Sequence, residues 1–257
     1  MCLILVAWRV HADYPLVLAA NRDEFFARPA APAHWWREPP ILAGRDLSAG
    51  GTWLGVARDG RFAALTNYRD PTLLQRAGPS RGELVPATLA AMLPAPLRLQ
   101  QLRGVAGHYN GFNLVFSDGE RLAVFESIPG DGRLLGAGVY GLSNHLLDTP
   151  WPKLVNAKSA LGAALTRLPD ERPLLELLRD ERQADDAQLP RTGVSLAWER
   201  LLSSAFIRAP GYGTRCSSIL LLDRSGHARF SEWSWDESGQ LSGQVEHRFE
   251  TAAAIDA

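Results

Sequence analysis

Cysteine, lysine and methionine are scarce in this chain of 257 residues, and no apolar run is long. Two cysteines are too few for a disulfide framework, which argues against a small disulfide-stabilised secreted domain and favours a reducing compartment. Lys153 and Lys158 are the only lysines, so nearly every basic residue is an arginine. We interpret this bias as the mark of a GC-rich coding genome, and it predicts a bacterial source.

The chain also lacks a surplus of charge. It has 27 basic and 28 acidic residues and a formal net charge of −1, which argues against a nucleic acid partner. The apolar start, Cys2 to Trp8, is much shorter than the roughly 20 residues of a membrane span and has no basic segment before it. We therefore expect a cytoplasmic protein with no membrane span. Six scattered histidines lack the spacing of a helical metal site, so we expect neither a metal nor a cofactor.

The order of apolar patterns predicts strands first, then helices, then strands again. Residues 2–10 and 14–26 are nearly continuous apolar runs, which indicates strands covered on both faces. Because the predicted helices are grouped instead of alternating with strands, we expect a single α+β domain over residues 1–257 with antiparallel sheets. Hairpins are predicted at 52–67, 111–127 and 213–236, and helices at 83–92, 151–168, 173–181 and 195–207. Residues 28–40 are predicted to form an irregular proline-rich loop, and residues 251–257 to be frayed.

The position of Cys2 directly after Met1 suggests chemistry. Met1 is normally removed when the next residue is as small as cysteine, which would leave Cys2 with a thiol and a free α-amine on one carbon. A thiolate is a nucleophile, and an α-amine with a pKa of about 7.7–8 can accept the thiol proton. This is the arrangement of N-terminal nucleophile enzymes. The alternative is that Cys2 is a small buried residue of a core strand.

Polar residues at strand ends are the second group of candidates. The segment "NRDE", Asn21 to Glu24, ends an apolar strand, and burying it without partners would be costly. On a regular strand Asn21 and Asp23 face one way and Arg22 and Glu24 the other, and an ion-pair network is the alternative to a functional site. Asparagine amides can stabilise an oxyanion, although an asparagine alone is more typical of a turn. The asparagines at strand ends are Asn67, Asn110, Asn113 and Asn144.

Several longer motifs follow one another along the chain. They are "MCLIL", "LAANRDEFFARP", "GGTWLGV", "AALTNYRD", "SRGELV", "YNGFNLV", "YGLSNHLLDTPWPKL" and "GYGTRCSSILLLD". These motifs, from Cys2 to about Asp223, resemble the NRDE family, also called the transport and Golgi organisation protein two family. The resemblance implies an Ntn-hydrolase-like fold, which is a four-layer αββα sandwich with antiparallel sheets.

The family is also similar, more distantly, to cysteine amidases such as penicillin V acylase and bile salt hydrolase. That similarity implies Cys2 as the nucleophile and Asp23 as the residue that steadies its amine. It also implies Asn144, and less strongly Asn67, as the asparagines of the site, and Arg215 as a distal arginine. The chain departs from the amidases at Arg22, which is adjacent to Asp23 instead of a few residues before it.

Two functions follow as hypotheses. The first is hydrolysis of an amide bond in a small molecule. The second is non-catalytic binding of haem or an acyl lipid, because eukaryotic members of the family have been linked to haem movement and to lipid or acyl-CoA metabolism. Exposed tryptophans would be compatible with a homodimer. Candidate substrate-binding residues are Asn21, Arg22, Trp35, Trp36 and His145, with the two tryptophans as an apolar lip over the site. The alternatives are a packed loop around the tryptophans and a surface position for the histidine.

The second thiol, Cys216, follows Arg215 at the start of an apolar strand. If Arg215 faces Cys2, alternation along the strand turns Cys216 to the opposite face. We therefore expect Cys216 to be buried under helices, inert, and not bonded to Cys2.

Overall fold

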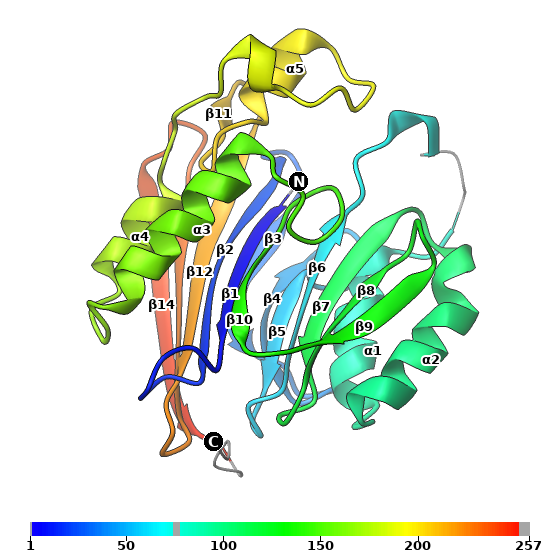
Figure 1. Cartoon of the computed structure of the whole chain (residues 1–257), viewed down its shortest axis with the longest axis vertical. Helices are drawn as coiled ribbons and strands as arrows, with labels where there is room; N and C mark the ends of the chain where they lie inside the picture. Colours follow the sequence, from blue (N-terminus) through cyan, green and yellow to red (C-terminus); the bar gives the residue numbers. More distant parts are fainter. Residues whose placement is uncertain (1, 74–77, 252–257) are drawn as a thin grey trace.

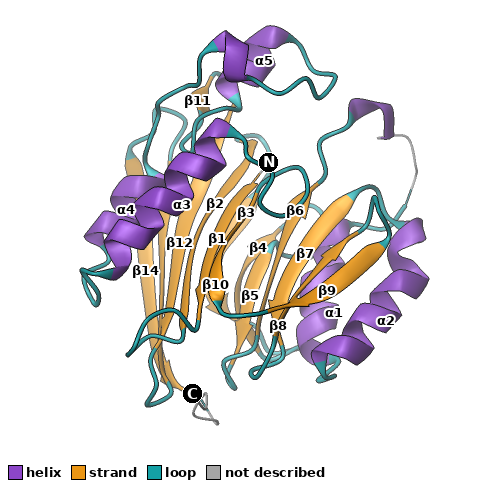
Figure 2. Ribbon diagram, viewed as in Figure 1, coloured by secondary structure: helices purple, strands orange, loops and turns teal. Residues whose placement is uncertain are grey.

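Two seven-stranded sheets lie face to face, and helices cover both outer faces (Figures 1 and 2). This computed structural model describes residues 2–73 and 78–251, so Met1 and most of the tail predicted to be frayed lie outside the described residues. All strand pairs are antiparallel. The four-layer αββα sandwich is therefore confirmed.

The first sheet, sheet A, combines the beginning and the end of the chain. Its order is β10-β1-β2-β12-β13-β14, with β11 paired to β12. The strand β2 thus lies between the N-terminal strand and a strand almost 200 residues later, which brings Cys2 and residues 212–216 to one end of the sheet. The strands are β1 (Cys2–Trp8), β2 (Leu16–Phe25), β10 (Gly138–Leu142), β11 (Arg208–Ala209), β12 (Tyr212–Leu222), β13 (His227–Trp235) and β14 (Leu241–Glu250).

The second sheet, sheet B, follows the chain order β3-β4-β5-β6-β7-β8-β9. Each strand pairs with the next one along the chain, and the connection between β6 and β7 contains α1 and α2. The strands are β3 (Ala30–Trp35), β4 (Ile41–Asp46), β5 (Leu54–Ala57), β6 (Phe62–Asn67), β7 (Phe112–Ser117), β8 (Leu122–Glu126) and β9 (Asp131–Leu135).

Three apolar cores separate the four layers. Along β1, Ile4 and Val6 enter the core between the sheets, whereas Leu3 and Leu5 enter the core under the helices of sheet A. This division explains why the first strand is apolar throughout. The helices α3 (Pro152–Leu165) and α4 (Arg172–Leu178) cover sheet A, while α1 (Leu84–Ala90) and α2 (Ala95–Val105) cover sheet B. Helix α5 (Leu196–Leu201) lies beyond the end of sheet A (Figure 1).

The structure corrects several predicted elements. Residues 28–40 are not a loop throughout, because β3 occupies six of them as an edge strand with an irregular register, where proline is tolerated. The helix predicted at 195–207 ends at Leu201. After it, the hydroxyls of Ser203 and Ser204 donate to nearby backbone carbonyls, which competes with helix continuation. The prediction also lacked α2, β4, β9, β11 and β14.

None of the helices within residues 2–73 and 78–251 combines the length and apolar character that crossing a membrane requires.

Candidate functional site

A cleft of about 570 Å³ opens between the sheets where β1 begins and β2 ends. Both sheets line it, together with the segment 78–82 before α1. Its uncharged polar lining includes Cys2, Cys216 and Asn67. Its charged lining consists of Arg22, Arg28, Arg45, Arg81 and Arg215 with Asp23, Glu24, Asp46 and Glu232.

Cys2 is the first residue of β1 and faces this cleft. Ile4 and Val6 enter the core between the sheets, and Cys2 faces the same side because side chains alternate along a strand. Only 9% of the residue is exposed. Burial raises the pKa of the Cys2 thiol above its ordinary value. The thiol is therefore protonated at neutral pH, and it needs a proton acceptor before it can act as a nucleophile.

Arg22 lies between the two cysteines, because its strand β2 pairs with β1 on one side and with β12 on the other. The sheet register pairs Arg22 with Cys2 on one side and with Cys216 on the other. All three residues line the cleft. Within the described residues, the Arg22 guanidinium has no hydrogen-bond or ion-pair partner. The site thus offers a half-buried cation directly beside the Cys2 thiol.

Asp23 is held by a short chain of hydrogen bonds at the end of β2. The Thr214 hydroxyl donates to Oδ1 of Asp23 over 2.7 Å, and the backbone N–H of Ile207 donates to that hydroxyl over 2.9 Å. Asp23 is buried, and its burial raises the pKa of the carboxyl. The charges of Lys153 and Arg69 lower this pKa and so favour the carboxylate.

Asn67 and Asn144 are linked by a hydrogen bond, but only Asn67 lines the cleft. Asn67 ends β6, is half-buried and lines the cleft. Asn144 is fully buried, and its Nδ2 donates to the backbone oxygen of Asn67 over 2.9 Å. The backbone N–H of Arg69 donates to the carbonyl of Asn144 over 2.7 Å. Asn67, the weaker candidate on the resemblance, is thus the one at the cleft, and Asn144 fixes the end of β6.

The predicted orientation of Cys216 is wrong, because β12 is irregular. The pairing of β12 with β2 shifts between Thr214 and Cys216, which leaves Arg215 as an extra residue in a bulge. Arg215 and Cys216 consequently both line the cleft. Both thiols are free, as predicted. One strand, β2, lies between their strands, so two inter-strand spacings place their Cα atoms roughly 10 Å apart, beyond the Cα separation of a disulfide.

The Cys216 thiol differs from that of Cys2 in its surroundings. Burial raises its pKa well above the ordinary value, and the thiol is hydrogen-bonded to Glu232. This environment keeps Cys216 protonated. The expectation of an unreactive second thiol is therefore consistent with its environment, although its position is at the cleft and not under the helices.

Arg215 is bound to the turn that follows β2. Its Nη1 donates to the backbone oxygens of Phe25 and Arg28, both over 2.9 Å. Its guanidinium also lies 4.9 Å from the centre of the Phe26 ring. These contacts fix the turn at residues 25–28, of which Arg28 lines the cleft.

Asn21 has no place at the cleft. It is fully buried, and its Nδ2 donates to the backbone oxygens of Leu178 and Ala205 over 2.7 and 2.8 Å. The Ser217 hydroxyl donates to its Oδ1 over 2.6 Å. Asn21 ties sheet A to its helical layer, so the structure corrects its assignment as a substrate-binding residue.

Trp35, Trp36 and His145 are also outside the cleft lining. Trp35 packs edge-on against Phe249 at 5.1 Å between ring centres. Trp36 is buried between sheet B and its helices and donates through Nε1 to the backbone oxygen of Ala43 over 3.0 Å. His145 lies 5.0 and 5.8 Å from the rings of Tyr68 and Trp151. The expected apolar lip over the site is therefore corrected as well.

Arg81 and Glu232 are among the cleft residues that the sequence analysis did not predict. Arg81 donates to the backbone oxygen of Gly111 over 3.0 Å, and its charge interacts with the Cys2 thiol. Glu232 accepts from the backbone N–H of Ala33 over 2.8 Å and thereby links sheet A to sheet B. The available signals were the arginine before the helix in "SRGELV" and the single acid in the strand "FSEWSW". Neither signal indicates that the side chain faces the cleft.

The family model for "Transport and Golgi organisation 2" matches residues 1–237. The chain belongs to this family. The transport and Golgi organization protein 2 homologs of Bos taurus and Homo sapiens are 38% and 39% identical over 241 and 242 residues, each covering 86% of this chain and 87% of the relative. The Drosophila melanogaster protein is 29% identical over 247 residues, which is 85% of this chain and 86% of the relative. These relatives are animal proteins, so the bacterial source stays a prediction.

Two solved structures overlap weakly with the chain. A Caenorhabditis elegans N-acylethanolamine-hydrolyzing acid amidase ortholog covers 86% of this chain and 92% of its own, at 9% identity and a TM-score of 0.44. A conjugated bile acid hydrolase from Clostridium perfringens covers 100% and 99%, at 10% identity and a TM-score of 0.42. Scores below 0.5 are too low to support a conclusion on chemistry.

Proposed function

We propose that this protein is an N-terminal nucleophile hydrolase that cleaves an amide bond of a small molecule, with Cys2 as the nucleophile after removal of Met1. The observation that supports it is the position of Cys2 at the start of β1, beside Arg22, on a cleft that Asn67 also lines. The processed residue would supply both a thiol and an amine there. The Asn67 amide would supply a donor for the oxyanion.

In the proposed reaction, the α-amine of Cys2 accepts the thiol proton and the thiolate attacks the carbonyl carbon of the amide. The carbonyl oxygen becomes an oxyanion, to which the side chain of Asn67 donates. The C–N bond breaks as the α-ammonium returns the proton to the leaving amine, and a thioester on Cys2 remains. Water then attacks the thioester, with the amine again as the base, and releases a carboxylic acid and the free thiol.

The other members of the site hold these groups in place. Asp23 steadies the amine, because its carboxylate lies at the end of the strand paired with β1. Asn144 holds the end of β6 and therefore Asn67. Arg215 holds the turn at residues 25–28 and with it Arg28, which lines the cleft.

The charges of the cleft support a substrate with a carboxylate. Arg28 is paired with Asp46 over 2.7 Å, and Arg215 donates to backbone carbonyls. Arg22 has no such partner within the described residues, and burial raises the pKa of Glu232, which favours its neutral form. A net positive charge therefore remains beside Cys2, and a carboxylate on the acyl or the amine part of the substrate would pair with Arg22.

Three measurements test this function. Intact-mass analysis of the purified protein is expected to show the loss of one methionine. A panel of N-acyl amino acids and neutral N-acyl amines is expected to contain a substrate that releases its amine, detected with an amine-reactive dye. Cys2→Ala should abolish the release and Cys216→Ala should retain it. Complete retention of Met1, or equal turnover by Cys2→Ala, would disprove the proposal.

The alternative function, non-catalytic binding of haem, has less support than hydrolysis. Among the cleft residues that the structure describes there is no histidine, and only the two thiols could bind iron. A haem titration without a saturable Soret shift would exclude this alternative. The predicted homodimer stays a prediction, with Trp198 exposed at 38%.

A further inference from the structure

Arg81 is a second cation of the cleft that lacks a counter-charge. It begins the short helical turn η2 (Arg81–Glu83) before α1, and its partly buried side chain lines the cleft. Across residues 2–73 and 78–251, its guanidinium makes one hydrogen bond, from Nη1 to the backbone oxygen of Gly111 over 3.0 Å, and no ion pair. Glu24 favours the charged form of Arg81 from beyond ion-pair distance. Most of the guanidinium donors therefore remain available to a ligand.

The neighbours of Arg81 hold its backbone in place. The Ser80 hydroxyl accepts from the backbone N–H of Gly82 over 3.3 Å, and the backbone oxygen of Gly82 accepts from that of Thr52 over 2.9 Å. A Cβ on Gly51 would lie 2.5 Å from the same oxygen, so the two segments approach as closely as glycine alone allows. A cation that is held in advance loses little conformational freedom when an anion binds.

The hydrogen bond to Gly111 places the Arg81 guanidinium beside the proposed oxyanion donor. The same backbone oxygen of Gly111 also accepts from the backbone N–H of Tyr68 over 2.9 Å. Tyr68 directly follows Asn67, which ends β6 in sheet B and lines the cleft. Arg81 therefore faces the cleft next to Asn67, on the side of sheet B.

Arg22 occupies the corresponding place on the other sheet. It is paired with Cys2 in sheet A and has no hydrogen-bond or ion-pair partner within the described residues. The proposed reaction puts the attacked carbonyl carbon at Cys2 and its oxygen at Asn67. The reacting carbonyl would thus lie between Arg22 and Arg81.

The remaining arginines of the cleft have other partners. Arg28 forms an ion pair with Asp46 over 2.7 Å. The Arg45 guanidinium lies 4.5 Å from the centre of the Trp36 ring, and Arg215 is bound to backbone carbonyls. The two arginines beside the reacting groups are thus the ones most open to acidic groups of a substrate.

We propose, on the basis of the proposed function, that Arg81 binds a second acidic group of the substrate, which is an amide with one acid on its acyl part and one on its amine part. One acid would pair with Arg22 and the other with Arg81, each through charge-assisted hydrogen bonds. An amide with a single acid would leave one of these partly buried cations without a counter-charge.

Binding of matched ligands tests the proposal without requiring turnover. Isothermal titration calorimetry is carried out on Cys2→Ala, which lacks the proposed nucleophile. The diacids are N-succinyl-, N-glutaryl- and N-adipoylglycine, and each is compared with the monoacid of the same chain length, N-butyryl-, N-pentanoyl- or N-hexanoylglycine. At least one diacid is expected to bind about tenfold more tightly than its monoacid. If no diacid binds more tightly than its monoacid, the proposal is overturned.

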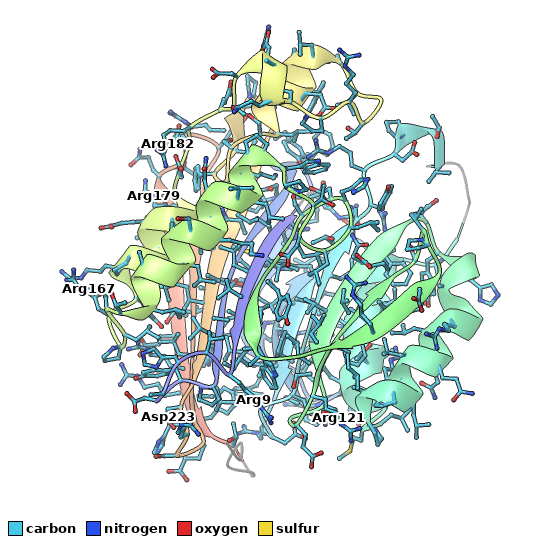
Figure 3. The ribbon with its side chains drawn as sticks, viewed as in Figure 1. Arg9, Arg121, Arg167, Arg179, Arg182 and Asp223 are labelled. Carbon is cyan, nitrogen blue, oxygen red and sulfur yellow. The ribbon has the colours of Figure 1, made fainter. Side chains whose placement is uncertain are left out.

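Variants of Arg81 assign the preference to this residue. Arg81→Gln, which keeps a donor for Gly111, is expected to remove the preference for the diacid and to leave the affinity for the monoacid unchanged. Arg81→Lys keeps the charge and is expected to retain part of the preference. Arg121→Gln is the control, because Arg121 lies in the turn between β7 and β8, beside Arg9 at the far end of β1 (Figure 3). Equal weakening of diacid and monoacid by Arg81→Gln, or the same loss in Arg121→Gln, would overturn the proposal.

Turnover of the same ligand pairs by the unsubstituted protein separates this proposal from the proposed function. If the diacids bind more tightly through Arg81 but no amide is cleaved, the proposed hydrolysis is wrong and the second anion site stands. If the amides are cleaved with equal kcat/KM for diacid and monoacid, and Arg81→Gln leaves this ratio unchanged, the hydrolysis stands and the second anion site is wrong.

Discussion

Cys2 and Arg22 are directly paired across β1 and β2, and both line the same cleft. The register is set by a hairpin of apolar strands, so the cation beside the thiol is fixed by the backbone of the sheet. Arg22 is also paired with Cys216 on its other side. The arrangement explains why one arginine can affect a substrate bound at Cys2.

Arg22→Gln is expected to weaken turnover of carboxylate-bearing amides more than that of neutral amides. A charge-assisted bidentate pair is lost, which costs about 1.5–3 kcal/mol, or roughly 10- to 100-fold in kcat/KM. Arg22→Lys should recover part of this loss, since it keeps the charge without the fork. Steady-state kinetics on matched substrate pairs measure the ratio. An equal loss on both substrates would assign Arg22 to the thiol and not to the substrate.

Cys2 and Cys216 are expected to differ in reactivity although they share a cleft. The Cys216 thiol is hydrogen-bonded to Glu232, and its pKa lies well above the ordinary value. Peptide mapping after brief exposure to iodoacetamide should find Cys2 labelled at least about tenfold faster. Mild oxidation should give no intramolecular disulfide, because β2, which carries Arg22, lies between the strands of the two cysteines. Detection of a Cys2–Cys216 peptide in the folded protein would contradict the described register.

Asn67 and Asn144 are expected to show strongly non-additive effects. Asn67→Ala removes the proposed oxyanion donor and should lower kcat by about 10²- to 10³-fold with a small effect on stability. Asn144→Ala removes the buried hydrogen bond to the Asn67 backbone, so it should reduce both kcat and thermal stability. The double variant should be little worse in kcat than Asn67→Ala. Additive losses in kcat would indicate that the two asparagines act separately.

Arg215→Met is expected to loosen the turn at residues 25–28 and to have a smaller effect on the catalytic step. The side chain would keep much of its apolar bulk but lose the hydrogen bonds to the backbone of Phe25 and Arg28. The free energy of unfolding should fall by about 1–3 kcal/mol. Limited proteolysis within residues 25–28 should accelerate in parallel. An unchanged stability with abolished turnover would instead place Arg215 in direct contact with the reacting atoms.

Glu232→Gln is expected to change how stability depends on pH. In the folded protein, burial raises the pKa of Glu232 above its ordinary value of 4.5. The contribution of Glu232 to the free energy of unfolding is therefore fully present below pH 4.5 and is lost as pH rises through the raised pKa. Glutamine keeps an acceptor for the backbone N–H of Ala33 and cannot ionise. The variant should therefore exceed the wild type in stability at pH 7.5 by about 1 kcal/mol, and by less at pH 4.5. Urea unfolding at the two pH values measures the difference, and a pH-independent difference would contradict this explanation.

The amino-acid sequence by itself determined the layers of the fold. Continuous apolar runs in the first two strands predicted sheets covered on both faces, and the two resulting cores are present. Ordered motifs predicted the family and the αββα sandwich. Of the catalytic residues that the resemblance implied, Cys2, Asp23, Asn67 and Arg215 line one cleft, whereas Asn144 is buried beside it.

Only the tertiary structure decided which polar side chains face that cleft. Alternation assumes a regular strand, and one extra residue at Arg215 was enough to bring Cys216 to the side of Cys2. Asn21 and Trp36 were equally plausible from their neighbours, but each is bound inside a different helix-covered core. The single acid in "FSEWSW" did not predict the role of Glu232, because that role depends on groups that are distant in sequence. Burial and long-range pairing decide that role, and neither can be read from the residues next to it.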